Sequence, residues 1–258
     1  MRRVEPKVFL VAETALQPAG LSGYLEHVGA PNWDTDATTP GEVIVEVMGR
    51  LCYCSFEPGL NANVTRVRVG NKAYLENILN SRHGSVLEHA SASFVFADVS
   101  RVFTHELVRH RAGTAFSQES LRYVRLTDLG LWLPPEIEAR PDVVALFEET
   151  FRSLEAIQTR LSEVYGLDAP GANFETKKKV TSAMRRGAPI GLATTIGATF
   201  NMRALRHVLE LRTDGAAEAE MRLVIGRLGE IATARWPAIF QDFERKEDGA
   251  WKPKYGKV

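Results

Sequence analysis

Residues 106–125 hold the densest group of side chains in the chain that could do chemistry. The stretch contains four arginines and a histidine, with glycine, threonine, serine and glutamine residues between them. Forked guanidinium groups bind phosphate oxygens, and hydroxyl and carboxamide groups hydrogen-bond to sugars and base edges. A solvated basic surface could carry as many arginines, but rarely with so many small polar residues between them. We therefore interpret the stretch as a phosphate- or nucleotide-binding site.

The composition of the whole chain limits its partners. Lys+Arg and Asp+Glu both number 32 in 258 residues, so no overall field attracts nucleic acid or an anionic membrane. The apolar run at residues 8–12 is too short for a signal-peptide core or a membrane span. Two cysteines, Cys52 and Cys54, exclude a disulfide framework and a four-cysteine zinc site. We expect a cytoplasmic protein that binds no metal, nucleic acid or membrane.

Hydrophobic periodicity and turn residues predict the elements that position this stretch. We expect an irregular excursion over residues 15–40, interrupted by about one helical turn, and a polar, mobile tail over residues 246–258. The predicted strands cover residues 7–14, 123–134 and 192–200, and a short helix turns into a further strand within residues 84–98. The predicted helices cover residues 38–53, 71–81, 101–111, 142–165, 173–186, 201–212 and 216–240.

Two of these elements carry the polar side chains of interest. Ser100 is a plausible N-cap for the helix over residues 101–111, which would bring Arg109 and Arg111 to its carboxyl end. If the chain is extended after residue 119, Ser120 and Arg122 lie on one side of a strand. In the helix over residues 201–212, Arg203 and the histidine at 207 share a face, and Asn201 and Arg212 share another.

The order of these motifs resembles the flavin-dependent thymidylate synthases. Arg-His-Arg at residues 109–111 is followed by Ser-Gln-x-Ser-x-Arg-Tyr at residues 117–123. Family members have seven residues between Arg-His-Arg and the second serine, whereas this chain has eight, and we place the extra residue in the loop at 112–116. Further matches are Glu-His-x-Ser at residues 88–91, Arg-x-x-x-Pro at 185–189, and Asn-x-Arg-x-x-x-His-x-x-x-x-Arg at 201–212.

The resemblance implies a fold, a reaction and a set of site residues. The fold would be a single α+β domain over residues 1–258, with a central, mainly antiparallel sheet flanked by long helices. The reaction would be reductive methylation of dUMP to dTMP by a cytoplasmic homotetramer with shared active sites, using FAD, methylenetetrahydrofolate as carbon donor and NADPH as reductant. Arg212 would be catalytic, because a fixed cation against the pyrimidine stabilises the ring as N3 loses its proton and charge builds toward C5. The residues implied to bind dUMP are Glu106, Arg109, Gln118, Ser120, Leu121, Arg122, Arg185 and Arg212, and those implied to bind FAD are His89, Ser91, Arg109, His110, Arg111, Gln118, Asn201, Arg203 and His207.

Other functions are less compatible with the residues. His105 and His110 lie at i, i+5, about 140° apart around a helix, so they do not form the i, i+4 pair of a zinc protease. Ser120 has no evident neighbouring base that would make it a nucleophile. A non-catalytic nucleotide- or RNA-binding module that uses the same arginines remains the alternative. The zero net charge and the absence of a known binding motif argue against it.

Overall fold

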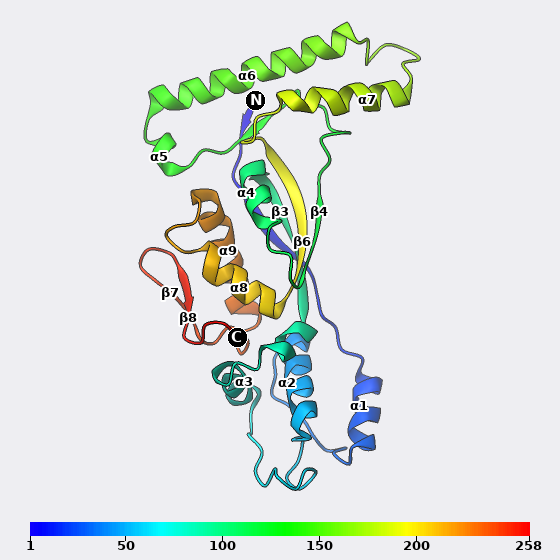
Figure 1. Ribbon diagram of the computed structural model, residues 1–258, viewed down its shortest axis with the longest axis vertical. Helices are drawn as coiled ribbons and strands as arrows, with labels where there is room; N and C mark the ends of the chain where they lie inside the picture. Colours follow the sequence, from blue (N-terminus) through cyan, green and yellow to red (C-terminus); the bar gives the residue numbers. More distant parts are fainter. The chain divides into compact units, whose positions relative to one another are not determined.

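A four-stranded sheet in the order β2-β3-β6-β4 supports the segments of interest. Its strands are β2 (Lys7–Glu13), β3 (Ser91–Ser100), β6 (Ala193–Asn201) and β4 (Thr114–Gln118). Burial alternates along β3 and β6, so one face of each strand lies in the hydrophobic core while the other carries mostly small side chains, some of them polar. The computed structural model describes residues 1–258 (Figure 1).

The chain divides into two compact units, and all four strands of this sheet contribute residues to both. Unit 1 comprises residues 1–9, 95–109 and 116–197, and unit 2 comprises residues 10–94, 110–115 and 198–258. The boundary separates Arg109 from His110, so the Arg-His-Arg motif is divided between the units.

Unit 1 contains the helices that flank the first motif. They are α4 (Arg101–Leu107), α5 (Pro135–Glu138), α6 (Pro141–Val164), α7 (Phe174–Met184) and the 3-10 turn η2 (Arg185–Gly187). The short strands β1 (Arg2–Arg3) and β5 (Gly130–Leu131) pair in parallel. Helices α6 and α7 run side by side (Figure 1), and the buried Gln158 Nε2 donates to the Met184 carbonyl across them at 3.0 Å.

Unit 2 contains the remaining helices and a hairpin. The helices are α1 (Pro18–His27), α2 (Pro40–Tyr53), α3 (Asn71–Asn80), α8 (Met202–Arg212) and α9 (Ala219–Arg235), with the 3-10 segment η1 (Gly84–His89). Strands β7 (Phe243–Arg245) and β8 (Trp251–Pro253) pair antiparallel. The core of this unit includes Trp236, whose ring meets that of Phe94 edge-on with centroids 6.4 Å apart.

The mixed helical and antiparallel-sheet fold class is confirmed, and most predicted elements are found within a few residues of their expected bounds. The helix predicted over 101–111 begins as expected, with the Ser100 side chain accepting from the Phe103 N–H, but it ends at Leu107. Its buried stripe includes Phe103 and Leu107, and the next positions on that face are His110 and Arg111. The helix ends there because it has no further apolar face to bury.

The strand predicted over 123–134 is wrong for most of its length, since only Gly130–Leu131 is a strand. Leu126, Leu129 and Leu131 all bury in one hydrophobic cluster. A regular strand would turn odd- and even-numbered residues to opposite faces, so the chain follows an irregular path to bury all three. Residues 120–123 form a turn, which removes the basis for placing Ser120 and Arg122 on one side of a strand.

Two further segments differ from expectation. The loop expected at residues 112–116 overlaps β4, which begins at Thr114, continues to Gln118 and belongs to the four-stranded sheet. The expected excursion over 15–40 contains the ten-residue helix α1. Within the expected tail over 246–258, β8 pairs with β7, and the Trp251 side chain is buried.

Candidate active site

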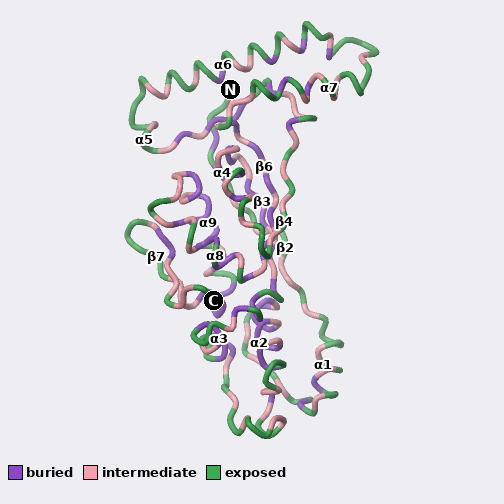
Figure 2. Tube along the Cα trace, in the orientation of Figure 1, coloured by how far each residue is buried: buried purple, intermediate pink, exposed green.

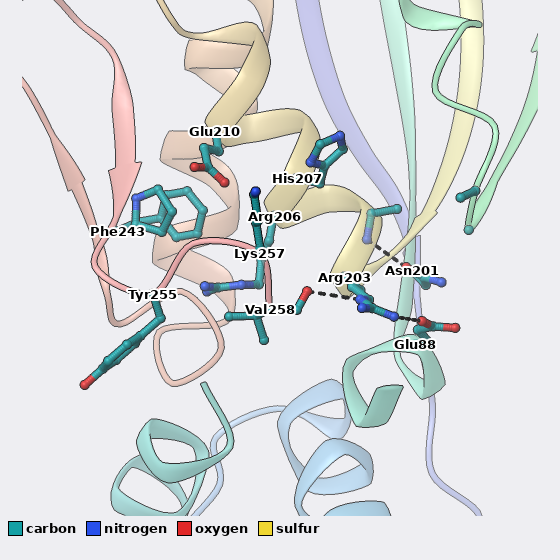
Figure 3. Close-up of a pocket in the computed structure, with 14 residues that line it drawn as sticks. Glu88, Asn201, Arg203, Arg206, His207, Glu210, Phe243, Tyr255, Lys257 and Val258 are labelled. Atoms are coloured by element: carbon teal, nitrogen blue, oxygen red, sulfur yellow. Dashed lines mark hydrogen bonds and ion pairs between the residues drawn. The ribbon is translucent and has the colours of Figure 1, made fainter. Parts of the chain in front are cut away.

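Helix α8 presents the polar residues of the second motif in unit 2. The Asn201 Oδ1 caps the helix by accepting from the Ala204 N–H at 2.8 Å. Leu205, Val208 and Leu209 are buried, and α8 packs on α9. The exposed Arg203 and His207 lie together on the side of α8 that faces a cavity (Figure 3). The apolar stripe of the helix therefore fixes which side chains remain available for a ligand.

The loop after the Arg-His-Arg motif is tied to the start of α8. The Gly113 carbonyl accepts from the Asn201 N–H at 2.8 Å, and the Thr114 hydroxyl donates to the His110 carbonyl at 2.5 Å. Gly113 has φ +69°, and a Cβ at this position would lie 2.4 Å from Asn201 Nδ2. Only glycine allows this backbone conformation and this close approach together. The two motifs thus share one local structure.

His110 and Arg212 form a direct hydrogen bond within unit 2. Arg212 Nε donates to His110 Nε2 at 2.7 Å. An imidazole nitrogen that accepts a hydrogen bond carries no proton, so the proton of neutral His110 is on Nδ1. The His110 and His207 rings also meet edge-on, with centroids 6.0 Å apart. The hydrogen bond orients the guanidinium of Arg212, the residue expected to be catalytic.

A cavity of about 370 Å³ lies beside α8 in unit 2 (Figure 3). Its walls include Asn201, Arg203 and His207, three of the residues expected to bind FAD. Arg203 donates from Nη1 to Glu88 Oε1 at 2.6 Å and from Nε to the Val258 carbonyl at 3.0 Å. An exposed arginine, a carboxamide and an imidazole are donors that suit the phosphates and sugars of a dinucleotide. The residues present therefore fit FAD.

Unit 1 groups several of the residues expected to bind dUMP. Gln118 Nε2 donates to the Thr104 hydroxyl on α4 at 3.0 Å. The Ser120 hydroxyl oxygen lies 3.4 Å from the backbone nitrogen of Arg122, which donates to it, and the Arg122 side chain is exposed. The Leu121 side chain is only 7% exposed and belongs to the core, so any contact of Leu121 with a nucleotide would come from its backbone.

A charged cluster that the motifs did not reveal lies next to these residues. Arg101 Nη2 donates to the Glu119 carbonyl at 3.3 Å. Burial lowers the pKa of Arg101, and the positive charge of Arg185 lowers it further, while Glu119 raises it. The signal available from sequence was an arginine directly after a serine N-cap, where the helix dipole disfavours a cation.

The remaining expected residues are spread over several elements of the two units. His89, Arg109 and Arg111 are exposed. The backbone N–H of Ser91 donates to the Thr14 hydroxyl at 2.8 Å, and Glu106 is half-buried on α4. Arg185 begins η2 and is exposed. No group of three or more His, Cys, Asp or Glu side chains has the arrangement of a metal site, and none of the helices is both long and apolar enough to cross a bilayer.

Comparison with known proteins identifies the family. The family model described as "Thymidylate synthase complementing protein" matches residues 35–238, a range that includes every expected site residue. The flavin-dependent thymidylate synthase of Mycobacteroides abscessus is 37% identical over 217 residues, covering 83% of both chains. The enzyme of the same name from Mycobacterium tuberculosis is 36% identical over 240 residues, covering 91% of this chain and 92% of the relative.

Solved structures share the fold. The UMP/dUMP methylase PolB from Streptomyces cacaoi, bound with 5-Br dUMP, has 18% identity and a TM-score of 0.64, covering 93% of this chain and 95% of PolB. Thymidylate synthase ThyX from Helicobacter pylori, complexed with FAD and dUMP, has 25% identity and a TM-score of 0.52, covering 74% of this chain and 89% of ThyX. Because the family model spans most of the sequence and the relatives match over most of their length, the chain belongs to the flavin-dependent thymidylate synthases.

Proposed function

We propose that this flavin-dependent thymidylate synthase converts dUMP to dTMP with methylenetetrahydrofolate as carbon donor and NADPH as reductant. The observation that supports the proposal most directly is the hydrogen bond from Arg212 Nε to His110 Nε2, 2.7 Å long. It joins the last arginine of the second motif to the histidine of the first. A cation whose orientation is fixed before the substrate arrives is what electrostatic activation of a pyrimidine requires.

The role of Arg212 follows from the chemistry of the ring. Methylation at C5 needs a pyrimidine that is electron-rich at C5, and loss of the N3 proton supplies that charge. A guanidinium against the O2 and N3 edge stabilises the anion, stays protonated, and can donate to two ring atoms at once. His110 holds the guanidinium plane, and its accepting Nε2 makes it a positioning residue for Arg212.

The proposed nucleotide site uses arginines for the phosphate and polar residues for the sugar and base. Arginine forks bind phosphate oxygens in pairs, and the Ser120 hydroxyl adds a donor. Glu106 and Gln118 would orient the sugar or base, and Leu121 would contribute its backbone. The arginines assigned to the phosphate are Arg109, Arg122 and Arg185.

The proposed flavin site uses the donors of α8 and of the first motif. When bound, FAD supplies the hydride that reduces the transferred carbon to a methyl group. This chain's contribution is to bind and orient the cofactor, and Arg203 on the cavity wall can exchange its Val258 and Glu88 partners for ligand phosphates. The residues assigned to FAD are His89, Ser91, Arg109, His110, Arg111, Gln118, Asn201, Arg203 and His207.

We also propose a cytoplasmic homotetramer with active sites that draw on several subunits. Helix α6 supports an assembly, because large apolar residues on it are exposed, and Figure 2 shows exposed positions along the length of the helix. Leu146, Ile157 and Val164 are 62%, 51% and 64% exposed. Spacings of 11 and 18 residues place them within about 20° of one another around the helix. An exposed apolar stripe of this kind is typical of a surface that another chain covers.

The test uses the purified protein and an Arg212→Ala variant. Wild-type protein should show flavin absorbance, change its spectrum on addition of dUMP, and form dTMP when folate and NADPH are present. Arg212→Ala should retain flavin and lose most turnover, because the charge is needed chiefly when the ring becomes anionic. Undiminished turnover of the variant at saturating dUMP would refute the role of Arg212. A colourless protein that binds nucleotides without turnover would favour the non-catalytic binding module instead.

A further inference from the structure

We propose that Arg101 is an additional phosphate-binding residue of the nucleotide site, acting together with Arg185 beside the segment that carries Ser120. The inference rests on the proposed function, because it assumes that the ligand of this segment is a nucleoside monophosphate. It adds a residue that lies outside all the sequence motifs. The arguments come from the backbone position of Arg101, its unpaired donor and the charges around it.

The backbone fixes Arg101 next to the segment that contains Ser120. Arg101 is the first residue of α4, and its N–H donates to the Leu192 carbonyl at 3.1 Å. Its side chain reaches the Glu119 carbonyl, with Nη2 as donor at 3.3 Å. Glu119 immediately precedes Ser120, and its own N–H donates to the Thr195 carbonyl at 2.9 Å. The guanidinium is therefore held one residue away from the serine assigned to the phosphate.

One donor of Arg101 is buried without a partner. Arg101 Nε has no hydrogen-bond partner and no significant exposure to solvent. Buried donors on charged groups nearly always have a hydrogen-bond partner, because a buried donor without one lowers the stability of the fold. The bond to the Glu119 carbonyl uses Nη2 and does not satisfy Nε. An acceptor supplied by a ligand would complete the hydrogen bonding of this guanidinium.

The charges around Arg101 favour an anion. Burial and the positive charge of Arg185 both lower the pKa of Arg101, so the cluster disfavours its own charged state. Glu119 is the nearby counter-charge, and its carboxylate already accepts from the Thr194 hydroxyl at 3.4 Å and the Thr195 N–H at 3.3 Å. The guanidinium groups of Arg101 and Arg185 carry two positive charges, and the single carboxylate of Glu119 offsets only one of them. A phosphate dianion would neutralise it and accept from both forks.

The test compares dUMP with deoxyuridine, which is the same nucleoside without the phosphate. Equilibrium dissociation constants are measured for wild type, Arg101→Gln, Arg101→Lys and the control Arg160→Gln. Arg160 is an arginine of the same unit whose side chain is 75% exposed and pairs with Glu163 on α6. Arg101→Gln should weaken dUMP binding about 10- to 100-fold, the range of one charge-assisted hydrogen bond to a phosphate. Deoxyuridine binding should stay unchanged, and Arg160→Gln should resemble wild type with both ligands.

The lysine variant keeps the inference testable if the glutamine variant does not fold. Arg101→Lys retains the charge and most of the stem but loses the fork, so it should weaken dUMP binding by a smaller factor and leave deoxyuridine binding unchanged. Equal losses for dUMP and deoxyuridine would show a purely structural role and overturn the inference. Normal dUMP binding by the Arg101 variants would also overturn it while leaving the proposed function intact. Failure of the wild-type protein to bind dUMP would overturn the proposed function and this inference together.

Discussion

Replacement of Gly113 by alanine is the most direct test of how the first motif is joined to α8. Gly113 has φ +69°, and an added Cβ would lie 2.4 Å from Asn201 Nδ2 and 2.7 Å from Asn201 Cγ. Both the backbone and the Asn201 side chain must therefore adjust. Asn201 caps α8 and lines the proposed flavin cavity, so the substitution should affect stability and cofactor binding together.

The expected cost has two parts. A left-handed backbone at alanine costs about 1–2 kcal/mol. Displacement of Asn201 loses the helix cap, which is worth about 1 kcal/mol. The sum is about 2–3 kcal/mol, which corresponds to a fall of about 4–12 °C in the unfolding midpoint of a chain this long.

The control and a double mutant separate the two parts. Gly249 has φ +85° and no atom within 4 Å of an added Cβ, so Gly249→Ala should cost only the backbone part. In an Asn201→Ala background, Gly113→Ala should likewise cost only the backbone part, which gives a coupling energy of about 1 kcal/mol between the two sites. Denaturant unfolding supplies the free energies, and fluorescence titration supplies the FAD affinity.

Two results would refute the reasoning about Gly113. The first is a cost for Gly113→Ala no larger than that for Gly249→Ala. The second is an unchanged cost in the Asn201→Ala background, which would mean that the close approach to Asn201 has no energetic consequence. Loss of FAD affinity in Gly249→Ala as large as in Gly113→Ala would separately exclude a local effect on the cofactor site.

Two further predictions concern unit 2. Gly226 and Gly229 both lie in α9, but an added Cβ meets no atom within 4 Å at Gly226 and would lie 2.5 Å from Trp251 Nε1 at Gly229. Gly226→Ala should therefore stabilise the protein by about 0.5–1 kcal/mol, because alanine has the higher helix propensity. Gly229→Ala should destabilise it. Unfolding midpoints in the opposite order would contradict the packing of Trp251 on α9. Deletion of Val258 removes an exposed hydrogen-bond partner that Arg203 must give up when it binds FAD. Such a partner is worth about 0–1 kcal/mol, so the deletion should tighten FAD binding by up to about fivefold. Weaker binding in a flavin titration would mean that Val258 helps to hold the cofactor.

Much of the framework could be predicted because local signals and burial agree. The cap at Asn201 and the apolar stripe of α8 are both visible in the sequence, and the helix is found within one residue of its expected bounds. The same holds for α6, which begins and ends one residue before the predicted helix. In such helices the apolar residues that predict the helix are also the residues that become buried, and both follow the same 3.6-residue period.

The errors have a common physical origin in tertiary contacts. Arg125 was expected in a strand, but its guanidinium bonds to Ser162 on α6 and to Asp168 after it. Such partners lie tens of residues away and leave no local pattern. The sequence motifs do not mark Arg101 for the same reason, since its neighbours Glu119 and Arg185 come together only in the fold. The link between His110 and Arg212 also spans 102 positions of sequence and could not be derived from spacing.

The bond between His110 and Arg212 limits how far this protein can be treated as modular. A chimera that takes residues 106–125 from one homologue and residues 201–212 from another would combine a histidine and an arginine selected in different surroundings. Swapping both segments together would preserve the partnership. Attempts to change substrate preference should therefore vary or exchange residues 106–125 and 201–212 together.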